Sequence, residues 1–270
     1  MLLSVKKTTL HPYHIVDPSP WPLLVAFGAF FMLFGTVLFA HSYNAGLTLL
    51  VLGFIMTFGF AGLWWRDIVR EGTFEGHHTF LVQHGLRFGM VLFIVSEIML
   101  FFAFFWAYFH SSLNPVPEIG CVWPPKGLIV INPWLLPLLN TALLLCSGAA
   151  LTWSHAALVG GYRLEAITGL LLTIVLASIF TCVQAYEYLN APFNISDGIY
   201  GSTFYMLTGL HGFHVFVGTL FLIVALLRLV WHHYTTNNHI GYEAAAWYWH
   251  FVDVVWIFLF IAVYTWGEGA

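Results

Sequence analysis

A run of nineteen residues, 91–109, constrains this sequence more than any other feature, because it is apolar except for Ser96 and Glu97. An α-helix rises about 1.5 Å per residue, so about 20 apolar residues cross the hydrocarbon core of a bilayer. The rest of the chain has the same character: 60% of its 270 residues are hydrophobic, 7% are charged, and the mean hydropathy is +0.85. A soluble domain carries about 25% charged residues. The chain is therefore expected to cross a membrane several times.

Seven segments are long and apolar enough to span a bilayer. Their expected bounds are residues 23–40, 45–65, 81–109, 134–158, 164–189, 200–231 and 244–266. Polar stretches rich in Asn, Ser, Gly and Pro separate several of them. We therefore predict an all-α fold, a bundle of seven transmembrane helices.

The spacing of these segments predicts how the bundle is organised. A short turn at residues 42–44 pairs the first two spans, whereas the polar stretch 66–80 separates that pair from the other five. We expect one integral membrane unit with three parts. These are an N-terminal segment and two helices over residues 1–65, a polar connection over 66–80, and a five-helix bundle over 81–270.

The basic residues are distributed unevenly about the spans. An odd number of spans places the two termini on opposite faces of the membrane. Lys126 then lies alone on one face, opposite the other seven basic residues: Lys6, Lys7, Arg66, Arg70, Arg87, Arg163 and Arg228. Loops rich in Lys and Arg stay on the cytoplasmic side, which corresponds to the matrix side in a mitochondrial membrane. The N-terminus is predicted to lie on that side.

The same composition excludes several classes of protein. Eight basic residues in a chain of net charge −4 are too few for a nucleic-acid-binding face. The three cysteines, Cys121, Cys146 and Cys182, are widely spaced and form no C-x-x-C pair, which favours small packing residues over a disulfide or metal framework. No apolar stretch long enough for a signal peptide precedes Pro18, so we expect the first hydrophobic segment to be a genuine span.

Glu97 is the most unusual residue of the third span. It follows Arg87 by ten residues, and at about 1.5 Å per residue it lies roughly 15 Å deeper in the membrane. Burial disfavours a charged carboxylate, so we expect Glu97 to be protonated at rest, hydrogen-bonded inside the bundle and reactive toward hydrophobic carbodiimides. Two interpretations carry equal weight: an element of proton relay or uptake, and a neutral acid that fixes helix packing.

A second acid, Asp253, lies inside the last span, three residues after His250. Residues at positions i and i+3 of a helix are neighbours, so these two side chains can share a hydrogen bond. We favour a structural polar pair over a proton path.

Histidines within the spans raise the question of a haem or copper site. His211 and His214 are three residues apart, and further histidines lie in other spans: His84, His155 and His250. Haem or copper needs ligands that face each other across helices, with further groups to orient them. No spacing here requires such a site. We therefore favour histidines hydrogen-bonded within the bundle and predict no metal site.

The segment WWRDIVREGTFEGHH, residues 64–78, concentrates indoles, arginines, acids and two histidines at the positively charged face. Arginine matches phosphate oxygens and tryptophan prefers headgroup depth, so this segment is a candidate site for anionic lipid. Arg228 could complete it from the sixth span. Ordinary interfacial anchoring remains an equal alternative.

Five long and unusual strings occur along the chain: HPYHIVDPSPWP, WWRDIVREGTFEGHHT, GLRFGMVLFIVSEIMLFFAFFWAYFHSSL, GLHGFHVFVGT and YWHFVDVVWIFLF. Through them the chain resembles subunit 3 of cytochrome c oxidase, of the mitochondrial type in the haem–copper oxidase family. The resemblance implies two N-terminal and five C-terminal helices separated by a V-shaped, lipid-filled cleft. It also implies a non-catalytic core subunit of respiratory complex IV, a proton-translocating oxidoreductase that transfers electrons from cytochrome c to oxygen.

The resemblance further implies roles for particular residues. Glu97 would be the reactive intramembrane acid that modulates proton uptake by the catalytic subunit and protects it during turnover. Phospholipid headgroups would be held by five residues: Trp65, Arg70, Glu71, His78 and Arg228.

Partners and location also follow from the resemblance. The expected partners are oxidase subunits 1 and 2, which hold haem a and copper, together with accessory subunits and membrane lipids. This chain would carry bound phospholipid but no redox cofactor. The implied location is the mitochondrial inner membrane, with the N-terminus in the matrix and the C-terminus in the intermembrane space. A bacterial plasma membrane is the alternative.

Two other functions are kept as alternatives. A self-contained proton or ion transporter could use Glu97 and Asp253, but such proteins usually show broken helices, inverted repeats or a continuous polar path. None of these is visible in the sequence. A haem-binding electron carrier would use the span histidines, and the isolated chain would then show a Soret absorbance band.

Overall fold

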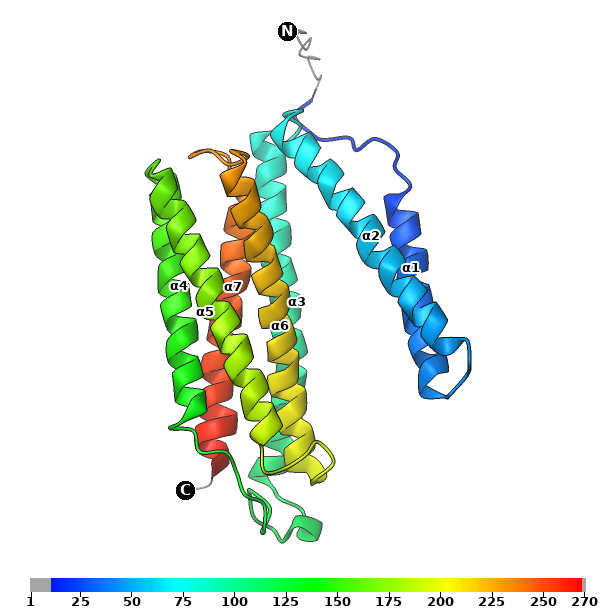
Figure 1. Cartoon of the computed structure of the whole chain (residues 1–270), viewed down its shortest axis with the longest axis vertical. Coiled ribbons are helices and arrows are strands. Elements are labelled where there is room, and N and C mark those ends of the chain that lie inside the picture. Colours follow the sequence, from blue (N-terminus) through cyan, green and yellow to red (C-terminus); the bar gives the residue numbers. More distant parts are fainter. Residues whose placement is uncertain (1–10, 269–270) are drawn as a thin grey trace. The chain divides into compact units, whose positions relative to one another are not determined.

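The computed structural model describes residues 11–268, and the regular structure in that part of the chain is entirely helical. The described residues form seven long helices, whose arrangement can be followed in Figure 1. Their bounds are α1 (Trp21–Ala40), α2 (Gly46–Thr73), α3 (Phe80–Leu113), α4 (Leu136–Val159), α5 (Arg163–Asn190), α6 (Gly198–Val230) and α7 (Ile240–Leu259). A π-helical turn, η2 (Phe260–Thr265), and a 3₁₀ turn, η3 (Trp266–Glu268), extend α7, and η1 (Pro117–Ile119) lies in the loop after α3.

All seven helices are long and apolar enough to cross a membrane, when α7 is taken together with η2. The prediction of a seven-span, all-α membrane protein is therefore confirmed. The main difference in bounds is at α2, which ends at Thr73 rather than at residue 65. A helix satisfies its own backbone groups, so it can continue past the apolar segment while its polar side chains reach water. Lys6 and Lys7, which contribute to the predicted orientation, lie outside the described residues.

The chain consists of two compact units that meet in the sequence between Leu86 and Arg87. The first unit contains α1 and α2, which form an antiparallel hairpin (Figure 1). The second unit contains α4, α5, α6 and α7 together with α3 from Arg87 onward.

Glycines bring the two helices of the hairpin into backbone contact. A Cβ atom added at Gly35 would meet the backbone of Leu50, and one added at Gly53 would meet the backbone of Met32. Gly28 and Gly46 lie in the same interface. Lipid tails are as apolar as leucine, so close packing of small residues is what holds such a pair together. At the open end of the hairpin the Trp21 indole N–H donates to a carboxylate oxygen of Asp67, at 2.6 Å.

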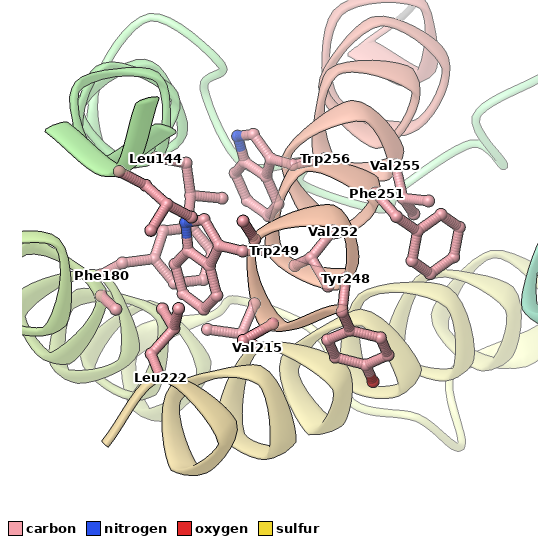
Figure 2. Packing of buried hydrophobic residues seen from close by; sticks show 14 of the residues in the cluster. Leu144, Phe180, Val215, Leu222, Tyr248, Trp249, Phe251, Val252, Val255 and Trp256 are labelled. Carbon is pink, nitrogen blue, oxygen red and sulfur yellow. The ribbon is translucent and has the colours of Figure 1, made fainter. Parts of the chain in front are cut away.

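The core of the second unit is built around α7. Figure 2 shows Trp249 directed from α7 toward Phe180 of α5 and Leu222 of α6, while Tyr248 lies against α6. Trp249 and Trp256 are both almost fully buried.

Three donors on α7, spaced seven residues apart, bond to three hydroxyl groups on α4. The pairs are Tyr242 with Ser154 at 2.6 Å, Trp249 with Ser147 at 2.9 Å, and Trp256 with Thr141 at 2.9 Å. Seven residues make two helical turns, so a repeat of seven keeps all three donors on one face. This hydrogen-bonded ladder sets the register of α7 against α4.

Long side chains connect α3 to the rest of the second unit. Near one end, Arg87 binds Glu243 of α7, with Nε 2.7 Å from Oε2 and Nη2 3.1 Å from Oε1. In the middle, the ring of Phe101 lies 4.9 Å from the ring of His214 on α6. Near the other end, buried Tyr108 packs edge-on against Trp123, with ring centroids 5.5 Å apart. The central contact places α3 beside the first candidate site.

Candidate functional site

Glu97 of α3 and His214 of α6 form a pair inside the second unit. The Nε2 atom of His214 lies 2.8 Å from Oε2 of Glu97. The His214 side chain is 5% exposed and that of Glu97 is 18% exposed, so little water can reach the contact. The expectation that Glu97 is hydrogen-bonded within the bundle is confirmed. His214 was predicted to be a hydrogen-bonded bundle histidine, and this is also confirmed.

The second ring nitrogen of His214 also has a hydrogen-bond partner. Its Nδ1 atom is 2.7 Å from the backbone carbonyl oxygen of Leu210. A carbonyl oxygen only accepts, so Nδ1 carries a hydrogen, and in a neutral ring Nε2 is then the acceptor. The contact with Glu97 holds one proton, which is either on the carboxylic acid or on the imidazole. This arrangement can pass a proton between two groups without moving either helix.

Aromatic rings surround His214 and exclude water from it. Phe101 lies 4.9 Å away between ring centroids, Tyr248 stacks at 6.3 Å, and Phe251 lies edge-on at 6.4 Å. In such surroundings an unpaired charge is costly, and a shared proton removes that cost.

His211, one helical turn before His214, has a different partner. Its Nε2 atom lies 3.2 Å from the carbonyl oxygen of Val252 on α7, and the side chain is almost fully buried. Rings of Phe180 and Trp256 pack against it. The two histidines of GLHGFH therefore bond to different helices, as expected for residues that fix helix packing.

The polar pair predicted within α7 is present but loose. The Nδ1 atom of His250 lies 3.6 Å from Oδ2 of Asp253, which is longer than an ordinary hydrogen bond. Asp253 is buried, and its Oδ2 atom lies against Gly148 of α4, where a Cβ atom would come within 2.5 Å of it. Gly148 thus provides the space that the carboxyl group occupies between α4 and α7.

Four of the five predicted lipid-binding residues lie in the first unit. Trp65 and the Arg70 side chain are each 61% exposed. Glu71 lies 3.8 Å from His14, and the His78 ring covers Gly72.

The N-terminal segment completes this polar surface. The ring of His14 stacks on that of His77 at 4.9 Å and meets that of His78 edge-on at 6.0 Å. The sequence analysis did not include His14, because 62 residues separate it from His77.

Arg228, the fifth predicted lipid-binding residue, lies on α6 in the second unit. Its guanidinium carbon is 4.4 Å from the centre of the Tyr234 ring, which is a cation–π contact. Burial raises the pKa of Tyr234 to about 12, although the nearby Arg228 charge acts in the opposite direction. The tyrosine therefore stays neutral, and its ring holds the arginine in place.

A third intramembrane acid was missed. Glu187 near the end of α5 is 2% exposed, and its Oε1 atom accepts from the Tyr264 hydroxyl at 2.7 Å and from Gln184 at 3.2 Å. Asn140 of α4 in turn donates to Gln184 at 3.1 Å. Glu187 lies three residues before the end of its helix, where polar residues are common, so its position in the sequence does not mark it as buried. The buried tyrosine that binds it comes from the π-helical turn after α7, which no local pattern indicates.

These features define the class of the protein. It is a seven-span helical membrane protein in which three acids of the second unit bond to side chains of other helical segments. Arg87 with Glu243, Glu97 with His214, and Glu187 with Tyr264 each cross between two helices.

Comparison with known proteins identifies the family. The sequence model of the family described as Cytochrome c oxidase subunit III matches residues 11–268. A cytochrome c oxidase subunit 3 from Prototheca wickerhamii is 61% identical over 257 residues, which is 95% of this chain and 98% of that relative. Relatives with the same name from Marchantia polymorpha and Cyanidium caldarium are 58% and 56% identical, over 95% and 99% of this chain and 97% and 99% of their own lengths.

The chain belongs to the cytochrome c oxidase subunit 3 family. The resemblance seen in the sequence is confirmed. The chain is thus an integral membrane subunit of respiratory complex IV, and it forms part of an oxidoreductase complex with other oxidase subunits.

Proposed function

We propose that this chain is a non-catalytic core subunit that supports proton uptake by the catalytic subunit and protects that subunit during turnover. The observation that carries this proposal is the 2.8 Å contact between Nε2 of His214 and Oε2 of Glu97 in largely buried surroundings. A group that holds one exchangeable proton in an apolar setting can buffer or relay protons to a neighbouring protein. The same contact also fixes α3 against α6, so the experiment must separate the two roles.

The test replaces Glu97 in the intact oxidase complex. Glu97→Gln keeps the size of the side chain and can still bond to His214, but it carries no titratable proton. We expect an initial rate of oxygen reduction close to normal, slower proton uptake and progressive inactivation during turnover. Glu118→Gln, which changes an exposed acid in the loop after α3, is the matched control. Lasting activity and normal proton uptake in the Glu97→Gln complex would contradict a proton role and leave only packing.

The proposal includes binding of structural phospholipid at the surface around Trp65, Arg70, Glu71 and His78. An exposed indole and an exposed guanidinium toward the same end of α2 suit a headgroup phosphate and the acyl region beneath it. Arg70 lies 3.8 Å from Glu75, a contact too long to saturate its donors. Arg228 would contribute a positive charge to a phosphate site in the second unit.

Native mass spectrometry of the purified complex tests the lipid proposal. Arg70→Gln should lower the number of retained anionic phospholipids. Arg66→Gln is the control, because Arg66 lies one turn earlier and is already bound to Asp67 at 2.8 Å. Equal lipid retention in both variants would count against a headgroup site at Arg70.

We further propose that the membrane is the mitochondrial inner membrane and that the partners include oxidase subunits 1 and 2, which hold haem a and copper. The uneven distribution of basic residues supports an N-terminus in the matrix and a C-terminus in the intermembrane space. The transporter alternative receives no support from the contacts, since Glu97 faces α6 whereas Asp253 faces α4. A sustained, Glu97-dependent proton flux from the isolated chain in liposomes would support the transporter alternative.

A further inference from the structure

Three metal-ligating side chains converge where α4 ends and α7 begins. His155 belongs to α4, His239 is the residue before α7, and Glu243 lies in the first turn of α7. One ligand atom from each lies within 4.8 Å of the other two. We propose that this cluster, His155 with His239 and Glu243, is a binding site for a divalent transition-metal ion, with Zn²⁺ the best chemical match.

The distances within the cluster are those between ligands of one ion. The Nε2 atoms of His155 and His239 are 3.3 Å apart, and His239 Nε2 is 3.4 Å from Oε1 of Glu243. Bonds of about 2.0–2.1 Å at the tetrahedral angle place two zinc ligands about 3.3 Å apart. Direct hydrogen bonds from a ring nitrogen are usually shorter, at about 2.9–3.0 Å. The spacing therefore suits an ion between the groups better than direct hydrogen bonds.

His239 is held in the tautomer that binds a metal. Its Nδ1 atom lies 3.0 Å from the carbonyl oxygen of Thr235, so Nδ1 carries the hydrogen and the Nε2 lone pair points into the cluster. Asn238 secures this turn, because its backbone N–H donates to the Thr235 hydroxyl at 3.1 Å. A carbonyl acceptor behind a histidine ligand is the usual support for a metal site.

His155 is oriented by an aromatic neighbour. The ring of Tyr242 stacks on it, with centroids 5.5 Å apart and planes at 22°. The hydroxyl of Tyr242 is itself fixed by donating to Ser154 at 2.6 Å. Tyr242 lies between His239 and Glu243 in the sequence, so the same turn that supplies two ligands also positions the third.

Arg87 carries a positive charge that opposes a cation at this site. Its two bonds to Glu243, at 2.7 and 3.1 Å, neutralise the carboxylate and use donors on both oxygens. A carboxylate has about four lone-pair sites, so Oε1 can still bind an ion. Three protein ligands leave the fourth position to water, which is typical of an exchangeable zinc site rather than a closed structural one. Zn²⁺ has no redox chemistry, so the site adds no redox centre to the chain.

The prediction of no metal site rested on the histidines within the expected spans. His239 lies in the short connection between α6 and α7, and only the fold brings it to His155, 84 residues earlier.

Zinc binding to the intact oxidase complex tests the proposal. The complex is stripped with a chelator and titrated with Zn²⁺ in equilibrium dialysis, with the haem spectrum as a check on assembly. The double variant His155→Gln/His239→Gln should bind one zinc ion fewer per complex than the unmodified protein. His110→Gln, which changes an exposed histidine at the end of α3, is the control and should lose none. If the double variant does not assemble, His155→Gln alone is expected to weaken this site at least tenfold.

Arg87→Gln provides a test in the opposite direction. Removing the positive charge frees the Glu243 carboxylate, so zinc should bind several-fold more tightly at the same stoichiometry. X-ray absorption at the zinc edge should show two nitrogen ligands at about 2.0 Å that disappear in the double variant. Equal zinc stoichiometry and affinity in the unmodified and double-variant complexes would overturn the proposal, as would unchanged affinity in Arg87→Gln. The cluster would then be only a hydrogen-bonded contact.

Discussion

The buried carboxyl group of Asp253 depends on a neighbour without a side chain. Its Oδ2 atom occupies the space where a Cβ atom of residue 148 would lie, 2.5 Å away. The sequence predicted that Asp253 pairs with His250, but the 3.6 Å between Nδ1 of His250 and Oδ2 of Asp253 is longer than an ordinary hydrogen bond. The pair alone does not explain how the acid fits between the helices.

The variant Gly148→Ala should therefore destabilise the chain. The added methyl group displaces the carboxyl group in a well-packed interface, which costs about 1–3 kcal/mol. The apparent melting temperature of this chain in the purified complex, followed by aggregation or fluorescence, should fall. Gly212→Ala on α6 is the control, because nothing lies within 4 Å of a Cβ atom there, and alanine favours a helix by up to about 1 kcal/mol. A normal melting temperature for Gly148→Ala would show that the interface can relax.

At the scale of helices, the ladder between α4 and α7 sets their register. Trp249 donates to the Ser147 hydroxyl at 2.9 Å, and both residues are buried. Ser147→Ala would leave the indole N–H without an acceptor, and a buried unsatisfied donor costs about 1–3 kcal/mol. We expect a lower melting temperature and faster hydrogen exchange in the amides of α7.

Ser178→Ala on α5 is the matched control for this ladder. The Ser178 hydroxyl bonds only to the backbone of its own helix, at Ile174, so its removal leaves no buried donor on another helix. If the two serine variants behave alike, the ladder does not hold the register.

Along its length, the hairpin of α1 and α2 relies on close backbone contacts at glycines. Gly53→Leu would force the two backbones apart, because even a Cβ atom meets the backbone of Met32. We expect less of the chain in assembled complex and greater protease sensitivity of residues 11–73. Gly59→Leu on the same helix has open space around it and should be tolerated better. If Gly59→Leu impaired assembly more than Gly53→Leu, the hairpin would not be packed through Gly53.

The topology of the whole molecule gives a further test. Cys121 lies exposed in the loop before α4, and Thr236 lies exposed in the connection after α6. Three helices separate them, so they should be on opposite faces of the membrane. In sealed vesicles, a membrane-impermeant maleimide should label Cys121 from one side only. In the double variant Thr236→Cys/Cys121→Ser, the same reagent should label the cysteine at position 236 only from the opposite side of the membrane. Labelling of both from one side would contradict seven spans.

Parts of the site could be predicted from the sequence, and the reasons differ between residues. Glu97 was identifiable because a carboxyl group in a long apolar run is costly wherever the helix packs. Its partner His214 was noted only as a bundle histidine, since a helix pattern cannot show which neighbour a face meets. Glu187 and His239 were missed, because each lies near a helix end where polar residues are common.

The sequence by itself determined that the chain crosses a membrane seven times, and it carried strings specific enough to indicate the family. The physical reason is that both determinants act within each segment. One is the length of the apolar stretch, and the other is the free-energy cost of unsatisfied backbone groups in lipid. Only the tertiary structure decided which polar groups meet, namely Glu97 with His214, Glu187 with Tyr264, and the cluster at His239. Those pairings depend on helix register and rotation, which arise from packing between segments far apart in the chain.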